Sequence, residues 1–311
     1  MTLRLGLVGC GRLAERGYAP AVARADGIEI VAVADISRSR RSLLAAKLGA
    51  SAHARTSELL AAGPLDGLIV CSPPAFHEEA ATQAAAAGVV ALVEKPPAAD
   101  AAGALRLAAL TPAPYCGFNR RFDQGAKLAR RVPPEGELEL HLVLHYRRAS
   151  WRPLQRGEDA LVDLGPHLID LALVLTGAVP LAARAHATRE RAGVVLATSR
   201  GTVRIECATN LPYRELVEIR DANGRRIARA SRGGRVRGVA GRVAPGVHPL
   251  VGSLTAQLQA YGRALRGEDP GLLATAAEGA AVMRVLDAAR RSDAVGGGTT
   301  EVVDGSQVAS G

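Results

Sequence analysis

One lysine stands at a position where its chemistry would matter, directly after an apolar run. The stretch VVALVEKPPAAD carries Lys95 between an apolar run and two prolines. Only three of the 39 basic residues are lysines, so the chain otherwise uses arginine for its positive charges. A lysine is a compact charge and, unlike arginine, it can lose its proton in a suitable environment. Lys95 is therefore a candidate hydrogen-bond donor or proton carrier. The alternative is a structural lysine that supports the turn at Glu94.

A second candidate lies in the stretch DLGPHLID. Asp163, His167 and Asp170 are spaced i, i+4 and i+7, which places them on one face of a helix. A histidine beside a carboxylate can exchange protons near neutral pH, because the carboxylate fixes its tautomer. The alternative is an Asp163 that only caps the helix and a His167 that only packs, and Asp170 is either an orienting group or a substrate contact. Proline is poorly tolerated beyond a helix's first turn, so Pro166 predicts a helix that begins near Gly165.

A glycine turn, GLVGCGRLA, follows the first apolar run. Gly9, Gly11 and Ala14 have the spacing GxGxxG/A, in which the glycines allow a tight turn and the close approach of a pyrophosphate. The N–H groups of the following helix would face the phosphates. Asp35 ends the next apolar run, 24 residues after Gly11, where an acid would bind the ribose hydroxyls of NAD. The alternative is a purely structural turn with Asp35 capping a helix.

Three arginines bear on the choice of dinucleotide. Arg38, Arg40 and Arg41 follow the acid closely and could hold the 2′-phosphate of NADP. The carboxylate of Asp35 would repel that phosphate. NAD is therefore favoured over NADP.

The elements that must position these residues fall into two patterns. Over residues 1–118, unbroken apolar runs alternate with Ala- and Leu-rich helical segments, which is typical of a parallel sheet covered by helices on both faces. The expected strands are 3–8, 28–34, 67–71, 89–93 and 114–118. This region is therefore predicted to be an α/β Rossmann domain that binds a dinucleotide.

The second pattern, over residues 119–311, predicts an α/β domain with an open, mostly antiparallel sheet. Expected strands are 136–148, 178–190, 193–199, 201–209 and 215–231, and the last contains the hairpin signal Asn223-Gly224. Helices are expected near 122–131, 165–175, 253–266 and 275–292. The domain boundary is thus placed between residues 118 and 119.

Composition narrows the possible partners. The formal charge is +9, but the arginines are scattered and aromatic residues are few, so nucleic acid is not an expected partner. The basic stretch RGGRVRGVAGR (232–242) has no aromatic residue and is interpreted as a solvated loop. No apolar run reaches 18 residues and the first strand leaves no room for a leader, so neither a membrane nor secretion is expected. The four distant cysteines predict free thiols and a cytoplasmic location.

Four motifs in order resemble the Gfo/Idh/MocA oxidoreductases, a family named for glucose–fructose oxidoreductase and inositol dehydrogenase. They are CSPPAFHEEAATQAAAAG, EKP, GFNRRFD and DLGPHLID, after the glycine turn. The resemblance implies a Rossmann domain followed by a domain with an open antiparallel sheet. It also implies hydride transfer between nicotinamide and a secondary alcohol or ketone of a sugar, amino sugar, nucleotide sugar or cyclitol. A homodimer or homotetramer formed through that sheet is a further expectation.

The resemblance assigns roles to individual residues. The implied catalytic residues are Lys95, Asp163 and His167. The residues expected to hold the dinucleotide are Gly9, Gly11, Arg12, Leu13, Asp35, Arg38, Ser72, Pro73, His77, Glu94 and Lys95. The candidate substrate contacts are Lys95, Asn119, Arg120, Trp151, Arg152 and His167. With Arg121 and Arg148, the arginines among them would meet an anionic substrate, and a solvated basic rim is the alternative.

Other classes of function remain open. His141 and His145 share one face of a strand, but no third ligand has metal-binding spacing, so no metal is expected. A non-catalytic dinucleotide sensor would not need Lys95, Asp163 and His167 together. An NAD-dependent glycoside hydrolase of the same family would release sugar without net formation of NADH.

Overall fold

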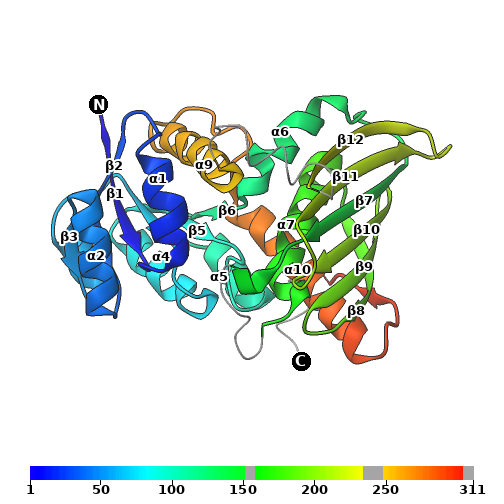
Figure 1. The fold of residues 1–311 in the computed structure, drawn as a ribbon, viewed down its shortest axis with the longest axis horizontal. Coiled ribbons are helices and arrows are strands. Elements are labelled where there is room, and N and C mark those ends of the chain that lie inside the picture. Colours follow the sequence, from blue (N-terminus) through cyan, green and yellow to red (C-terminus); the bar gives the residue numbers. More distant parts are fainter. Residues whose placement is uncertain (151–157, 234–247, 304–311) are drawn as a thin grey trace. The chain divides into compact units, whose positions relative to one another are not determined.

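The computed structural model describes residues 1–150, 158–233 and 248–303, which form two compact units. Figure 1 labels most of the helices and strands of both units. Unit 1 consists of the described residues of Met1–Asp123 and Val247–Ala280, and unit 2 of those of Gln124–Gly246 and Ala281–Gly311. The sequence pattern predicts one boundary, after residue 118, whereas in the structure unit 1 extends to Asp123 and also includes a C-terminal segment. None of the described helices has the length and apolar character needed to span a membrane.

Unit 1 is built on a seven-stranded sheet in the order β13-β6-β5-β4-β1-β2-β3. All neighbouring strands are parallel except β13 and β6. The strands are β1 (Leu3–Val8), β2 (Ile28–Ala34), β3 (Ser51–His53), β4 (Gly67–Val70), β5 (Val90–Glu94), β6 (Tyr115–Gly117) and β13 (Ala274–Thr275). Strand order reverses direction at β1 and β4, and such a switch point in an open α/β sheet opens the crevice in which ligands bind.

The helices of unit 1 connect these strands. They are α1 (Ala19–Val22), α2 (Arg38–Leu48), α3 (Thr56–Ala61), α4 (His77–Ala86), α5 (Ala101–Ala108), α9 (Pro249–Leu265) and the first turn of α10 (Ala276–Ala294). A π-helical turn, Ala14–Tyr18, precedes α1, and short 3₁₀ turns lie at Pro74–Phe76 and Asn119–Phe122. The predicted strands of the first domain are confirmed; β3, β13 and the π-helical turn are too short to have been predicted from periodicity.

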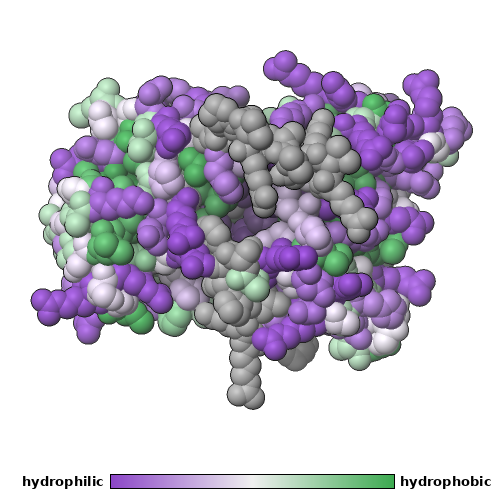
Figure 2. All heavy atoms as spheres, viewed as in Figure 1, coloured by the Kyte–Doolittle hydropathy of each residue, from purple (hydrophilic) through white to green (hydrophobic). Residues whose placement is uncertain are grey.

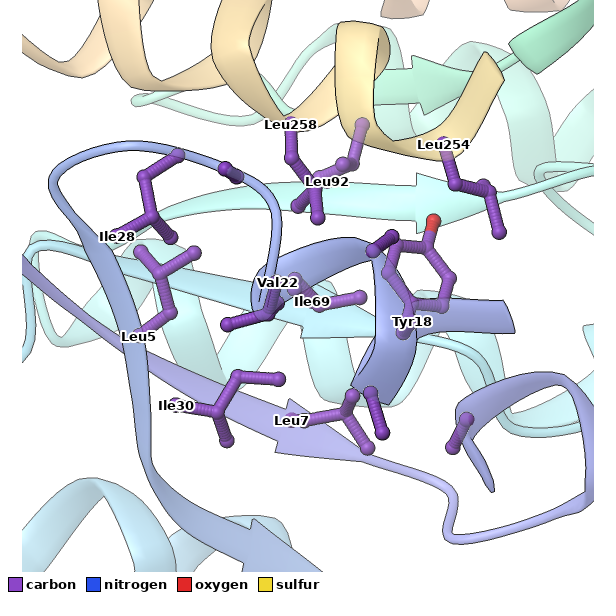
Figure 3. Packing of buried hydrophobic residues seen from close by; sticks show 14 of the residues in the cluster. Leu5, Leu7, Tyr18, Val22, Ile28, Ile30, Ile69, Leu92, Leu254 and Leu258 are labelled. Carbon is purple, nitrogen blue, oxygen red and sulfur yellow. The ribbon is translucent and has the colours of Figure 1, made fainter. Parts of the chain in front are cut away.

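The core of unit 1 explains why α9 belongs to it. Figure 3 shows Leu258 of α9 directed at Leu92 of β5, and Leu254 of the same helix beside Tyr18. Tyr261, also on α9, is fully buried, accepts a hydrogen bond from Leu68 N (3.1 Å) and donates one to Val90 O (2.7 Å). Leu254, Leu258 and Tyr261 bury apolar surface that β1, β4 and β5 would otherwise expose, so α9 stabilises the Rossmann sheet.

Unit 2 is built on a second seven-stranded sheet, in the order β12-β11-β7-β10-β9-β8-β14. Only β7 and β10 pair in parallel, which confirms the mostly antiparallel sheet. The strands are β7 (Leu138–His145), β8 (Pro180–Ala187), β9 (Arg191–Thr198), β10 (Gly201–Ala208), β11 (Arg214–Asp221), β12 (Arg226–Gly233) and β14 (Thr300–Glu301). The helices of this unit are α6 (Gln124–Leu128), α7 (Ala160–Thr176) and the rest of α10, with 3₁₀ turns at Ala129–Arg131 and Arg148–Ser150.

The hairpin β11–β12 forms where Asn223-Gly224 predicts one. Its loop has three residues. Gly224 N donates to Asp221 O (2.9 Å), and Gly224 is the residue of the loop that takes a positive φ, of 76°. The turn is closed by Asp221, whose Oδ1 accepts from Asn223 N and Arg225 N. Figure 2 shows mostly hydrophilic side chains over this hairpin at the upper right.

Helix α7 begins earlier than predicted. It starts at Ala160 and is capped by Asp159, whose Oδ1 accepts from Val162 N (2.8 Å), so Pro166 lies inside the helix and the expected start near Gly165 is wrong. The proline removes one intrahelical hydrogen bond, at a typical cost of about 3 kcal/mol. The burial of Leu161, Leu164 and most of the following residues against the second sheet offsets that cost.

The close packing of α9 on β4 predicts the effect of a single methyl group. A Cβ at Gly67 would overlap the hydroxyl of Tyr261, so we expect Gly67→Ala to lower the free energy of unfolding by about 1–3 kcal/mol in urea titrations. Gly193→Ala in β9 is the matched control, because its Cβ would meet no heavy atom within 4 Å. Equal stability of the two variants would show that α9 does not pack as described.

Candidate functional site

The carboxyl ends of the parallel strands in unit 1 bring the predicted cofactor residues to one edge. Val8 pairs with Ala34 and with Val70, and Val70 pairs with Val93. The residues that follow these strand ends therefore lie at the same edge of the sheet. They are Gly9, Asp35, Cys71, Ser72, Glu94 and Lys95.

The glycine turn is shaped by its backbone. Gly9 has a φ of +93°, and a Cβ there would come within 2.5 Å of Ser72 N, so no other residue fits. At Gly11 an added Cβ would meet nothing within 4 Å, which marks open space next to the turn. Ala14 is fully buried, as the third position of the fingerprint requires. Arg12 is exposed and Leu13 packs against the core at the start of the helix that follows.

Asp35 links the glycine turn to the next loop. Its Oδ2 accepts from Cys10 N (2.8 Å) and its Oδ1 from Ser37 N (2.7 Å). The cap of α2 is Ser37, so Asp35 is not the helix cap that the alternative reading required. Burial, together with the negative charge of Asp35, raises the pKa of the Cys10 thiol to about 12, so that thiol stays protonated.

The arginines after Asp35 differ in how they are held. Arg41 Nη1 donates to Asp35 O (3.1 Å) and Ile36 O (3.2 Å), so part of its guanidinium is engaged by backbone. Arg38 opens α2 and is exposed, as is Arg40. Ile36 is 92% exposed directly beside the acid, an apolar surface that the sequence analysis did not consider.

Ser72, Pro73 and His77 lie between β4 and α4. Ser72 Oγ is a buried hydroxyl for which the described residues provide no hydrogen-bond partner. His77 is 1% exposed, with Nε2 at 2.7 Å from Ser72 O and Nδ1 at 3.1 Å from Pro96 O. Burial lowers the pKa of His77, although these carbonyls favour a protonated ring. His77 therefore ties the Ser72 loop to the loop after Lys95, and its ring faces backbone on both sides.

Glu94 ends β5, and Lys95 follows it. Glu94 is 6% exposed, accepts from Tyr18 Oη (2.6 Å) on Oε1 and from Lys95 N (3.0 Å) on Oε2. Lys95 is partly buried, and the peptide to Pro96 is cis. Tyr18 was missed by the sequence analysis, because nothing local links a helix residue to a strand end 76 positions later.

Three observations indicate that a dinucleotide fits this edge of the sheet. The turn leaves open space at Gly11, a buried hydroxyl lacks a partner at Ser72, and a fixed carboxylate stands at Asp35. The glycine turn and the helix N-terminus would hold the phosphates, while Asp35 would accept from the ribose hydroxyls.

In unit 2, Asp163 is held by two residues that the sequence did not indicate as its partners. Arg148 Nε lies 3.3 Å from Asp163 Oδ2, and Tyr146 Oη donates to the same oxygen (3.2 Å). Arg148 Nη1 in turn donates to Tyr146 Oη (2.6 Å). Burial, followed by the charge of Asp163, raises the pKa of Tyr146. His167 is partly buried one turn further along α7, and Asp170 is 1% exposed.

The predicted substrate residues are placed unevenly. Asn119 is buried in unit 1 and its Nδ2 donates to Ser253 Oγ (2.8 Å), and Arg120 is partly buried. Arg121 is 3% exposed and pairs with Glu278 (3.0 Å), and Arg148 is 9% exposed and pairs with Asp163. The alternative prediction, that these two arginines belong to a solvated basic rim, is therefore wrong. Trp151, Arg152 and most of the basic stretch 232–242 lie outside the described residues.

The two histidines on β7 are not arranged as metal ligands. His141 Nε2 lies 2.8 Å from Glu206 Oε1 on the neighbouring strand. Burial and then the charge of Arg214 lower the pKa of His145. Within residues 1–150, 158–233 and 248–303, no group of three His, Cys, Asp or Glu side chains could hold a metal ion.

Comparisons with known proteins agree with the motifs. The family described as "Oxidoreductase family, NAD-binding Rossmann fold" matches residues 3–113. Two relatives from Saccharopolyspora erythraea are each 30% identical: inositol 2-dehydrogenase 2 over 61% of this chain and 58% of its own length, and inositol 2-dehydrogenase 1 over 68% and 69%. The match thus spans under two thirds of the first relative.

Among solved structures, the fold is similar to that of myo-inositol dehydrogenase from Lactobacillus casei in complex with NAD(H) and myo-inositol. The TM-score is 0.81 at 18% identity, over 98% of each chain. GenD2 from gentamicin A biosynthesis, in complex with NAD, has a TM-score of 0.82 at 21% identity, over 97% of each chain. The glycine turn, the hydrogen-bonded carboxylate of Asp35 and the EKP motif lie at one edge of a Rossmann sheet. Together with the match over 69% of inositol 2-dehydrogenase 1, they show that the chain belongs to the Gfo/Idh/MocA oxidoreductase family.

Proposed function

We propose that this protein binds NAD(H) at the carboxyl edge of the unit 1 sheet and oxidises a secondary alcohol of a cyclitol, with inositol as the model substrate. The observation that carries the proposal is the glycine turn, which has open space at Gly11 and is hydrogen-bonded through Cys10 N to the fixed carboxylate of Asp35. The names of the relatives, inositol 2-dehydrogenases, support the cyclitol. Retention of Lys95, Asp163 and His167 favours an enzyme over a sensor.

The charges around Asp35 support NAD as the cofactor. A carboxylate at this position accepts from the ribose hydroxyls and repels a 2′-phosphate. Arg41, one of the cations that would otherwise favour NADP, donates to two backbone carbonyls instead. Ile36, exposed beside the acid, offers an apolar surface on which an adenine ring could be buried.

The chain's own residues would then handle the proton. Bound NAD⁺ supplies the hydride acceptor. The family resemblance gives His167 the role of taking the proton of the reacting hydroxyl and Lys95 that of donating a hydrogen bond to its oxygen. Asp163 would orient His167, and its own carboxylate is held by Tyr146 and Arg148. The ion pair fixes Asp163 before any substrate arrives, which lowers the entropy cost of assembling the site.

We also infer a cytoplasmic homodimer or homotetramer. The four cysteines are free thiols, which suits a reducing compartment. In β9 the side chains alternate between exposed and buried, so one face of the unit 2 sheet is open while α7 packs on the other. Polar side chains lie on the strands of this sheet, including His141, whose Nε2 is 2.8 Å from Glu206 Oε1, and Arg220, which pairs with Glu218 (2.7 Å) on the same strand, and they suit a polar contact between copies.

The preference for NAD should depend on the carboxylate of Asp35. We expect Asp35→Ala to weaken NAD⁺ binding about tenfold or more, the loss typical of hydrogen bonds to a charged group, and to narrow or reverse the preference over NADP⁺. Dissociation constants from fluorescence titration measure both. Asp66→Ala is the control, because Asp66 also accepts a backbone N–H (Arg4 N, 2.7 Å) but precedes β4 at the opposite edge of the sheet. Tighter NADP⁺ binding by the parent protein would refute the assignment.

Turnover should depend on His167. With NAD⁺ and a panel of inositols, sugars and amino sugars, we expect the parent to form NADH on a cyclitol. His167→Asn should lower kcat by about 10²–10⁴-fold, because a general base is lost, with NAD⁺ affinity within about twofold. His141→Asn, on the open sheet face, should leave kcat unchanged. If His167→Asn turns over at a rate close to that of the parent, this histidine only packs and is not the general base. Release of sugar without formation of NADH would indicate a hydrolase.

A further inference from the structure

A buried chain of hydrogen bonds in unit 1 joins α9 to the strand end that carries Lys95. Gln257 Nε2 on α9 donates to Tyr18 Oη (3.2 Å), which donates to Glu94 Oε1 (2.6 Å). The other carboxylate oxygen accepts from Lys95 N (3.0 Å). Figure 3 shows the hydroxyl of Tyr18 directed toward α9. The chain thus connects three elements that are remote in sequence.

Every hydrogen bond in this chain points toward Glu94. Tyr18 and Gln257 have no exposed surface and Glu94 is 6% exposed, so water does not compete for these bonds. A carboxyl group that accepts on both oxygens is placed to be ionised, because a protonated one would need an acceptor of its own. The arrangement therefore stabilises a buried negative charge beside Lys95.

Burial acts against that charge. It raises the pKa of Glu94, whereas the hydrogen bond from Tyr18 and then the ammonium of Lys95 lower it. Cys71 is a further titratable group near Glu94, and its thiol is kept neutral because burial, followed by the charge of Glu94, raises its pKa. On β6 the neighbour is Gly117, where a Cβ would lie 3.0 Å from Glu94 Oε1. Among the described groups that favour the ionised form of Glu94, the hydroxyl of Tyr18 acts most strongly.

Two features argue that this chain does more than fill the core. Gln257 Oε1 is buried and finds no partner among the described residues, and such an atom costs about 1–3 kcal/mol. An apolar residue at this position would avoid that cost. The bond that Gln257 donates to Tyr18 is what the amide provides in return. Tyr18 also ends a π-helical turn, and π-helical turns within helices are frequent at functional sites.

We propose that Tyr18 and Gln257 are positioning residues for Lys95, acting through Glu94. They hold Glu94 as a fixed carboxylate, whose bond to the Lys95 N–H and whose charge keep the lysine in place as a donor at the edge of the sheet. The catalytic consequence rests on the proposed function, but control of Glu94 by Tyr18 does not.

The test compares two buried tyrosines. Tyr18→Phe and Tyr261→Phe each remove one buried hydroxyl from the same core, but the Tyr261 hydroxyl bonds to β4 and β5 backbone rather than to Glu94. An infrared pH titration of the full-length protein follows the protonated carboxyl band that is missing in Glu94→Gln. Losing a donor to the carboxylate favours protonation, so we expect Tyr18→Phe to move this titration up by about one pH unit. Tyr261→Phe should leave the titration in place.

The kinetic arm uses the same variants with NAD⁺ and inositol. We expect Tyr18→Phe to lower kcat about tenfold, with the substrate KM and the NAD⁺ affinity within about twofold, and to shift the acid limb of the kcat profile to higher pH. Tyr261→Phe should lower only the melting temperature. Gln257→Leu, which removes an unpartnered oxygen as well as a donor, should shift both profiles in the same direction without loss of stability.

The outcomes separate the two proposals. If the titration stays in place in both Tyr18→Phe and Gln257→Leu, or if it moves while kcat is unchanged, the positioning role is wrong. If Tyr18→Phe does not fold, Gln257→Leu alone decides in the same way. An inactive parent protein counts against the proposed function only, because the infrared titration needs no substrate and still tests whether Tyr18 and Gln257 control Glu94.

Discussion

The hydrogen-bonded register of four parallel strands is the constraint on which the cofactor edge depends. Gly9 N donates to Ala34 O (2.8 Å) and Cys71 N donates to Val8 O (2.9 Å), so β1, β2 and β4 end level with one another. In a parallel sheet the carboxyl ends necessarily share an edge, and here Gly9, Asp35, Ser72 and Lys95 lie within two residues of the strand ends. A one-residue slip of any strand would move its terminal residue out of reach of the others.

The polar groups at this edge are fixed by bonds between loops. Asp35 accepts from Cys10 N and Ser37 N, and His77 lies between the carbonyls of Ser72 and Pro96. The carboxylate of Glu94 accepts bonds from Tyr18 and from Lys95 N. Each group is therefore held before a ligand binds, and a prearranged site spends less binding energy on ordering its own residues.

Sequence periodicity predicted the strands well, but it did not predict how distant elements pack together. The runs 3–8 and 28–34 coincide with β1 and β2 because buried parallel strands are apolar throughout, and that pattern is local. The return of α9 to unit 1 was not predictable, since Leu254 and Leu258 show only that a helix has an apolar face. Pro166 misled the prediction of α7, because local propensity argues for a helix start whereas the burial of Leu161 and Leu164 extends the helix.

In the candidate site, too, local sequence patterns were predictable and contacts between separate elements were not. The glycine spacing and Asp35 could be recognised from the sequence, because the backbone needs them at fixed positions after a strand. Tyr18 with Glu94, and Tyr146 with Arg148 at Asp163, could not, because these contacts depend on packing between separate elements. The residues that hold a site in place therefore have no local signature, while the residues expected to touch the ligand do.

The most direct test of the account is whether the strand end after Glu94 requires a lysine or only a positive charge. The measurement is kcat for Lys95→Arg beside Lys95→Ala, with NAD⁺ affinity as the control for folding. A small donor that must approach one oxygen cannot be replaced by a planar guanidinium, so we expect both variants to lose about 10²–10⁴-fold in kcat with NAD⁺ affinity little changed. If Lys95→Arg keeps most of the activity, charge alone suffices and the role given to Lys95 is wrong.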